Sequence, residues 1–242
     1  MGKIPKQLAM LFPPSWGGRR RGAGRKPKTG QRQMPHAPRP LHCGRHPVHV
    51  TLRSGFRSMR SQFVFPTVRA AIAGTSARRG STFRIVHFSV QDTHVHLIVE
   101  ADDTAALIAG VRGLEISIAK RINRLTFRRG TFWADRWHGR DLTTPRAVRH
   151  ALVYVMSNGK KHGSHHSGFD PCSSALYFSG FRESAGVPPI ARNSRIVPRS
   201  LAPPAEVPIS EPSTWLLRVG WRKYGLISIH EAPGGRKPAR ER

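Results

Sequence analysis

Residues 83–101 read Phe-Arg-Ile-Val-His-Phe-Ser-Val-Gln-Asp-Thr-His-Val-His-Leu-Ile-Val-Glu-Ala, two largely apolar runs on either side of a short polar turn. The β-branched and aromatic residues predict strands over 83–90 and 94–101, joined as a hairpin. In the second run apolar residues alternate with His94 and His96, so both imidazoles should leave the same face of the strand. Two such nitrogens can hold a divalent metal ion, although an isolated pair is more often two ordinary histidines.

The stretch 146–161 predicts an amphipathic helix, capped by Thr144 and ending at a glycine and two lysines. Its apolar stripe should face the core and comprises Val148, Leu152, Val155 and Met156. Tyr154 and Asn158 lie at the flank of this stripe, about 40° apart and one turn above the other. The spacing alone is explained as well by the packing of a half-buried aromatic as by a functional pair.

Together the two elements resemble the single-tyrosine HUH transposases, in particular the REP-associated tyrosine transposases. The resemblance rests on the His94-Val95-His96 strand and the Tyr154-x-x-x-Asn158 helix, and it extends in order over residues 44–180. It implies an enzyme that cleaves and rejoins single-stranded DNA, with His94, His96 and Asn158 as metal ligands and Tyr154 as the nucleophile that forms a 5′-phosphotyrosine. The sequence departs from many relatives just after Asn158, where glycine and lysines replace a stretch that contains proline.

The implied chemistry suits these residue types. A divalent metal polarises a phosphate oxygen and orients the phosphodiester. Two imidazoles and an amide oxygen are compatible with Mg²⁺ or Mn²⁺, and the imidazoles favour Mn²⁺. A covalent phosphotyrosine conserves bond energy for rejoining, so no nucleotide triphosphate is needed, and the sequence has no Gly-Lys-Ser/Thr phosphate loop.

The composition favours a polyanionic partner. Lys and Arg number 41 against 13 Asp and Glu, a formal net charge of +28. Such a field attracts nucleic acid, although a genome of high GC content, which favours arginine, would also raise the charge. We expect single-stranded DNA that carries hairpins or palindromic repeats, and the chain could act as a homodimer. The candidate DNA contacts are Arg136 and His138 on an expected strand over 131–138, and Arg112, Lys120 and Arg124 on an expected helix.

The order of the expected elements is βαββαβα. Its first strand covers 46–52, its first helix runs from 57 to about 77 with a disturbance at Pro66, and its second helix opens at Asp102 and Asp103. This order predicts an α+β fold, a ferredoxin-like antiparallel sheet with helices on one face.

Four regions are expected along the chain. They are a disordered basic arm over 1–43, the catalytic domain over 44–180, a proline-rich linker over 181–212, and an aromatic and basic segment with a tail over 213–242. In the last region, Trp215, Leu216 and Val219 are expected to dock on the main domain, although its aromatics could instead stack on unpaired bases.

Two cysteines far apart argue against a disulfide scaffold or a zinc ribbon. No run has the length of a membrane span or the form of a signal peptide, so a cytoplasmic, nucleoid-associated protein is expected. Two other functions stay open. One is a replication or mobilisation nickase of the same chemistry, and the other is a non-catalytic basic nucleic-acid-binding protein whose histidines and tyrosine are structural.

Overall fold

The computed structural model describes residues 40–79, 82–161, 169–184 and 208–233. Most of the expected basic arm and most of the expected linker lie outside these residues. None of the helices within the described ranges combines the length and the apolar character needed to span a bilayer. The elements, in chain order, are β1 (Val48–Arg53), α1 (Phe65–Arg79), β2 (Phe83–Val90), β3 (His94–Ala101), α2 (Thr104–Leu125), β4 (His138–Asp141), α3 (Pro145–Lys161), η1 (Ser174–Tyr177), η2 (Arg182–Ser184), α5 (Trp215–Arg218) and η5 (Gly220–Tyr224).

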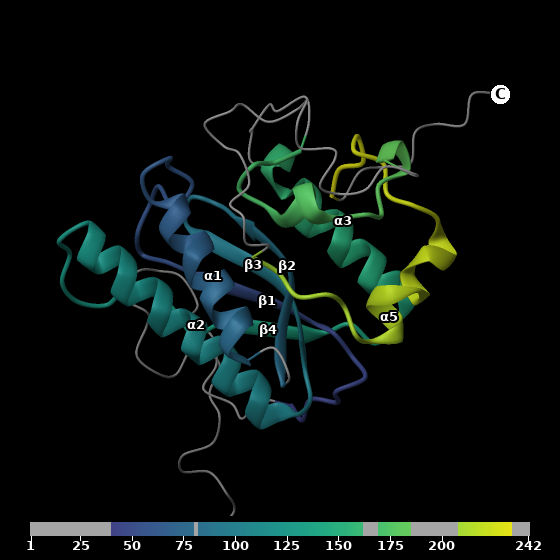
Figure 1. Ribbon diagram of the computed structural model, residues 1–242, viewed down its shortest axis with the longest axis horizontal. Coiled ribbons are helices and arrows are strands. Elements are labelled where there is room, and N and C mark those ends of the chain that lie inside the picture. The colour runs from purple at the N-terminus through teal and green to yellow at the C-terminus, as the bar shows by residue number, and fades with distance from the viewer. Residues whose placement is uncertain (1–39, 80–81, 162–168, 185–207, 234–242) are drawn as a thin grey trace, which may run out of the picture. The chain divides into compact units, whose positions relative to one another are not determined.

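The strands form one antiparallel sheet in the order β2-β3-β1-β4 (Figure 1). This is the ferredoxin-like arrangement, in which the first and third strands are central. The predicted α+β class is confirmed, and β2 and β3 have the bounds predicted from their β-branched and aromatic residues.

One face of the sheet is covered by α1 and α2, which also pack on each other (Figure 1). Val95, Leu97 and Val99 of β3 are buried on this face, and Asp103 caps α2 by accepting a hydrogen bond from the Ala106 amide. The two crossover helices thus share one face, as expected. Because β3 alternates, its other face carries His94, His96 and Ile98.

The second face is covered by α3, which packs against β2 and β3. The predicted apolar stripe of α3 is buried there, in one cluster with Val86 and Ile98. Thr144 accepts a hydrogen bond from the Ala147 amide, as expected of an N-cap. The helix that follows β4 therefore forms a third layer, on the face that carries the histidines.

Two elements differ from the sequence-based expectation. Helix α1 begins at Phe65, because Ser58 adopts a left-handed conformation (φ 72°) and Pro66 occupies the first turn of the helix.

The fourth strand covers His138–Asp141 in place of 131–138. The chain turns before it, where the Asp135 carboxylate accepts a hydrogen bond from the Arg136 amide, and an isolated bridge joins Trp133 to Ser54, the residue after β1.

The segment 208–233 packs on the main body, next to α3. Leu216 is buried as expected, together with Leu217, Trp221 and Ile227. Trp215 and Val219 do not dock as expected, since they are 51% and 52% exposed. The buried Glu100 carboxylate of β3 accepts hydrogen bonds from the backbone amides of Ser213 and Thr214, which fixes the start of the segment.

Candidate active site

The site is built on the face of β3 that α3 covers. The rings of His94 and His96 lie with centroids 4.8 Å apart and planes at 83°. His96 is paired across the sheet with Thr51 of β1 and Ser89 of β2, and it is only 4% exposed. The predicted histidine pair therefore lies side by side on a central strand.

A threonine hydroxyl lies next to the Nδ1 atom of each histidine. Thr51 Oγ1 is 3.1 Å from Nδ1 of His96, and Thr93 Oγ1 is 3.2 Å from Nδ1 of His94. A hydrogen bond to one ring nitrogen fixes the orientation of the ring and the tautomer. With Nδ1 of both rings held by hydroxyls, Nε2 is the nitrogen through which each ring would bind a metal.

Tyr154 comes to this site from α3. Its ring meets the His96 ring edge-on, with centroids 4.9 Å apart and planes at 87°. The buried stripe of α3 leaves Tyr154 at its border, half-buried. Desolvation raises the pKa of the Tyr154 phenol above its usual value, so the group keeps its proton at neutral pH.

Asn158 lies one turn further along α3 and is fully buried. Neither Oδ1 nor Nδ2 of its amide has a hydrogen-bond partner within the described parts of the chain. A buried amide without partners is unfavourable by about 1–3 kcal/mol, so the fold alone does not explain it. It suits a residue that binds a ligand from outside the chain.

These residues fit a metal site of mixed ligands. No group of three or more His, Cys, Asp or Glu side chains suited to a metal ion occurs in the described ranges. A metal bound by His94 and His96 could take the amide oxygen of Asn158, which lies one turn beyond Tyr154 on α3, as a third protein ligand. The unpartnered amide is available for that role, and two imidazoles with one amide oxygen leave further coordination positions open.

Sequence reasoning missed His49. Its ring centroid lies 5.4 Å from that of His96 and 5.6 Å from that of Tyr154. Burial lowers its pKa to about 4, with smaller contributions from the charges of His138 and Arg140. The alternating pattern of the first strand fixed which residues share a face with His49, but the register against β3 that places it beside His96 is a non-local property.

The candidate DNA contacts divide into two groups. His138 is paired with Thr51, so it lies exposed on the same face as His96, and Arg136 is exposed just before β4. Arg112, Lys120 and Arg124 are exposed on α2. Because α2 covers the opposite face of the sheet, these three residues lie on the other side of the sheet from Tyr154.

Arg140 of β4, which the sequence reasoning missed, is exposed and paired with His49.

No family model and no curated protein matches the chain, whereas some solved structures are similar to it. Among solved structures, the chain is similar to a REP-associated tyrosine transposase bound to a REP hairpin, at 18% identity and a TM-score of 0.46, over 75% of this chain and 96% of that chain. The chain is also similar to a protein assigned as a transposase from Deinococcus radiodurans R1, at 16% identity and a TM-score of 0.33, over 49% of this chain and 90% of that chain.

Proposed function

We propose that this protein is a transposase-type enzyme that cleaves and rejoins single-stranded DNA through a covalent bond to Tyr154. The observation that carries the proposal is the contact, within one chain, of the Tyr154 ring with the ring of His96, which itself lies against the ring of His94, with the buried Asn158 one turn further along α3. Packing explains a half-buried tyrosine or a buried histidine separately. It does not explain why these polar groups converge on one face, or why the Asn158 amide, one turn from Tyr154, has no partner among the described residues.

The roles of the residues follow from their positions. His94, His96 and the Asn158 amide oxygen would hold a divalent ion, which, when bound, polarises a phosphate oxygen and orients the phosphodiester. The Tyr154 hydroxyl attacks phosphorus and gives up its proton, and the bond from phosphorus to the 3′-oxygen breaks. The 3′-oxygen takes up a proton and leaves as a hydroxyl, while the 5′-phosphate stays on the tyrosine. Attack by a 3′-hydroxyl reverses the reaction and frees the phenol.

The proposed substrate is an unpaired DNA strand next to a hairpin or palindromic repeat. The net charge of +28 favours a polyanion. His138 and Arg140 are exposed at the edge of the sheet and share the face of Tyr154, so they can meet phosphates of a strand that runs toward the site.

A labelled single-stranded oligonucleotide tests the proposal. Incubation with Mn²⁺ should give an adduct that survives denaturing electrophoresis. Tyr154→Phe should abolish it, and Tyr224→Phe, a matched change at an exposed tyrosine, should not. An adduct that persists in Tyr154→Phe would contradict the assignment. Salt-dependent binding with no product in either Mg²⁺ or Mn²⁺ would instead indicate a nucleic-acid-binding protein without activity.

A further inference from the structure

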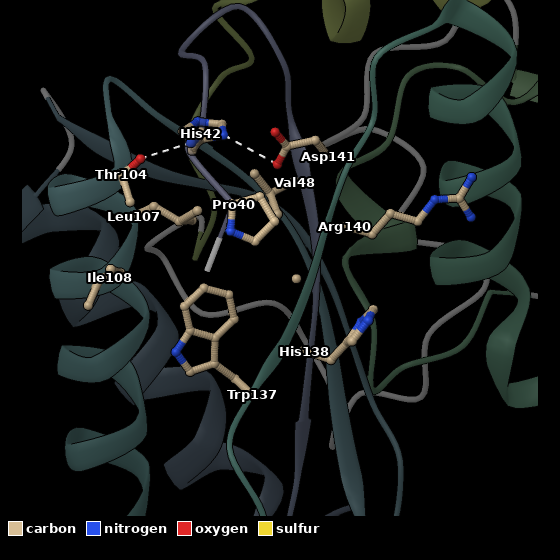
Figure 2. A pocket seen from close by; sticks show the side chains of 11 residues that line it. Pro40, His42, Val48, Thr104, Leu107, Ile108, Trp137, His138, Arg140 and Asp141 are labelled. Atoms are coloured by element: carbon tan, nitrogen blue, oxygen red, sulfur yellow. Dashed lines mark hydrogen bonds and ion pairs between the residues drawn. The ribbon is translucent and has the colours of Figure 1, made fainter. Parts of the chain in front are cut away.

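A cavity of about 350 Å³ lies beside β4, on the side of the sheet that faces α2. Figure 2 shows its lining: the side chains of Pro40, Leu107, Ile108 and Trp137 surround the hollow, and His42 and Asp141 lie at one end. Strand β4 is at the edge of the sheet. The side chains of His138 and Arg140 leave the opposite side of this strand, so only β4 separates the cavity from the face that carries Tyr154.

The walls of the cavity suit one flat aromatic group. The indole of Trp137 forms one wall, and aliphatic side chains of α2 form another (Figure 2). A Cβ atom on Gly139 would lie 2.6 Å from the Trp137 ring, so the glycine allows the indole to lie close against the strand. The volume is at the lower end of the range for small-molecule pockets, which favours a single ring system. Aromatic and apolar walls of this kind bind unpaired bases in many proteins that bind single strands.

The polar end of the cavity carries a carboxylate. Asp141 Oδ1 is 3.4 Å from Nδ1 of His42, and no hydrogen bond reaches Oδ2 from the described residues. Nε2 of His42 lies 3.0 Å from the Ala101 carbonyl oxygen, so this ring is fixed from both sides. A carboxylate repels phosphate and accepts N–H groups. Among the bases, guanine presents two adjacent N–H donors on its Watson–Crick edge, which match the two oxygens of one carboxylate.

We propose that this cavity binds one unpaired guanine of the DNA strand that Tyr154 cuts, a proposal that rests on the proposed function for the identity of the strand. The base lies against Trp137 with its N1–H and N2–H groups on Asp141. Its sugar and phosphate lie at the edge of β4, where Arg140 can meet the phosphate. Because Arg140 is paired with His49, whose ring is beside Tyr154, a strand anchored in the cavity is led across β4 toward the nucleophile.

Equilibrium binding tests the proposal without any cleavage. Fluorescein-labelled oligothymidylates that carry a single dG, dA or dC are titrated with the full chain in EDTA, and anisotropy is measured. The wild-type protein should bind the dG oligonucleotide about tenfold more tightly than the others, the discrimination expected of one bidentate contact to a base. Ile108→Trp, which fills the cavity from a side chain that is 38% exposed, should remove this preference. Asp141→Asn should also remove it, because one acceptor becomes a donor.

Ile116→Trp is the matched control, since Ile116 is an exposed isoleucine of the same helix outside the cavity lining. It should keep the preference for dG. Equal affinities for the three oligonucleotides would overturn the proposal, and so would equal losses of the preference for dG in Ile108→Trp and Ile116→Trp. Tyr154→Phe should keep the preference while it loses the adduct. A wild-type protein that prefers dG but forms no adduct would contradict the proposed function alone. A wild-type protein that forms the adduct but shows no preference for dG would contradict the cavity proposal alone.

Discussion

The ring of Tyr154 meets the ring of His96 edge-on, with centroids 4.9 Å apart. The two residues belong to one chain, and α3 reaches β3 because its buried stripe packs on Ile98 and Val86 of the same sheet. The nucleophile of the proposed reaction and its proposed metal ligands therefore meet without a second copy of the chain. A homodimer stays a prediction, and it is not needed to complete this site.

Thr51→Val should weaken metal binding without changing the fold. The substitution keeps the shape of the side chain and removes the hydroxyl 3.1 Å from Nδ1 of His96. Loss of such a partner typically lowers metal affinity by about 10- to 100-fold. The Mn²⁺ concentration that gives half-maximal adduct should rise by that factor, and isothermal titration of Mn²⁺ should show the same shift. Thr131→Val, at an exposed threonine, should leave both unchanged. An unaltered Mn²⁺ requirement in Thr51→Val would exclude His96 as a ligand oriented by this hydroxyl.

Asn158→Leu should stabilise the metal-free protein while it abolishes activity. The substitution removes a fully buried amide whose polar atoms have no partners in the described part of the chain. Removal of an unsatisfied polar group should raise the free energy of unfolding by about 1–3 kcal/mol. Urea unfolding in EDTA measures this change.

Addition of Mn²⁺ to the same unfolding experiment tests whether the Asn158 amide binds the metal. A ligand that binds only the folded state stabilises it by mass action, so Mn²⁺ should raise the unfolding midpoint of the wild-type protein. It should not raise that of Asn158→Leu. A loss of stability on this substitution in EDTA would mean that the amide has a structural partner, and the argument for a ligand-binding role would fail.

The sequence was sufficient for the parts of the site that depend on local periodicity. Strict alternation in β3 placed His94 and His96 on one face, and helical spacing placed Asn158 one turn beyond Tyr154. Both relationships lie within one element, where the geometry of a strand or a helix fixes them.

The remaining parts depend on contacts between elements that are distant in the chain. His49 lies beside His96 because β1 pairs with β3 in one particular register, which no local pattern reveals. Strand β4 has only four residues, His-Gly-Arg-Asp, which are exposed or half-buried in turn, so no apolar alternation marks it in the sequence. The docking of Trp221 in place of Trp215 likewise follows from how η5 packs on α3.

Stability should fall as the pH falls below about 6.5, because His87 is buried in its neutral form. Desolvation lowers its pKa from 6.5 to about 3. The unfolded chain therefore binds a proton between these values that the folded chain does not, and the stabilisation present above pH 6.5 is lost as the pH decreases. The expected loss is about 2 kcal/mol between pH 6.5 and 5 from this residue. In urea unfolding, His87→Gln should lower the pH dependence, whereas His230→Gln, at an exposed histidine, should not. Parallel curves for the wild type and His87→Gln would contradict the prediction.

Arg149→Met should slow adduct formation and leave oligonucleotide affinity unchanged. The Arg149 guanidinium, on α3, donates hydrogen bonds to both carboxylate oxygens of Glu231, at 2.7 and 2.9 Å, and to the carbonyl oxygens of Gly225 and Leu226. Methionine keeps an apolar stem and loses these bonds, so the segment 208–233 should exchange its amide hydrogens faster. Because Trp221 of this segment packs in the same cluster as α3, a loosened segment supports the helix that positions Tyr154 less firmly.

The exposed Arg146, one turn earlier on α3, supplies the control for this prediction. Arg146→Met should change neither hydrogen exchange in 208–233 nor the rate of adduct formation. The comparison separates two roles of the segment. If Arg149→Met speeds exchange in 208–233 but leaves the rate of adduct formation at the wild-type value, the segment stabilises the fold without positioning Tyr154. A loss of oligonucleotide affinity without a loss of rate would instead indicate that the segment contacts DNA, as its exposed aromatic residues Trp215 and Tyr224 would allow.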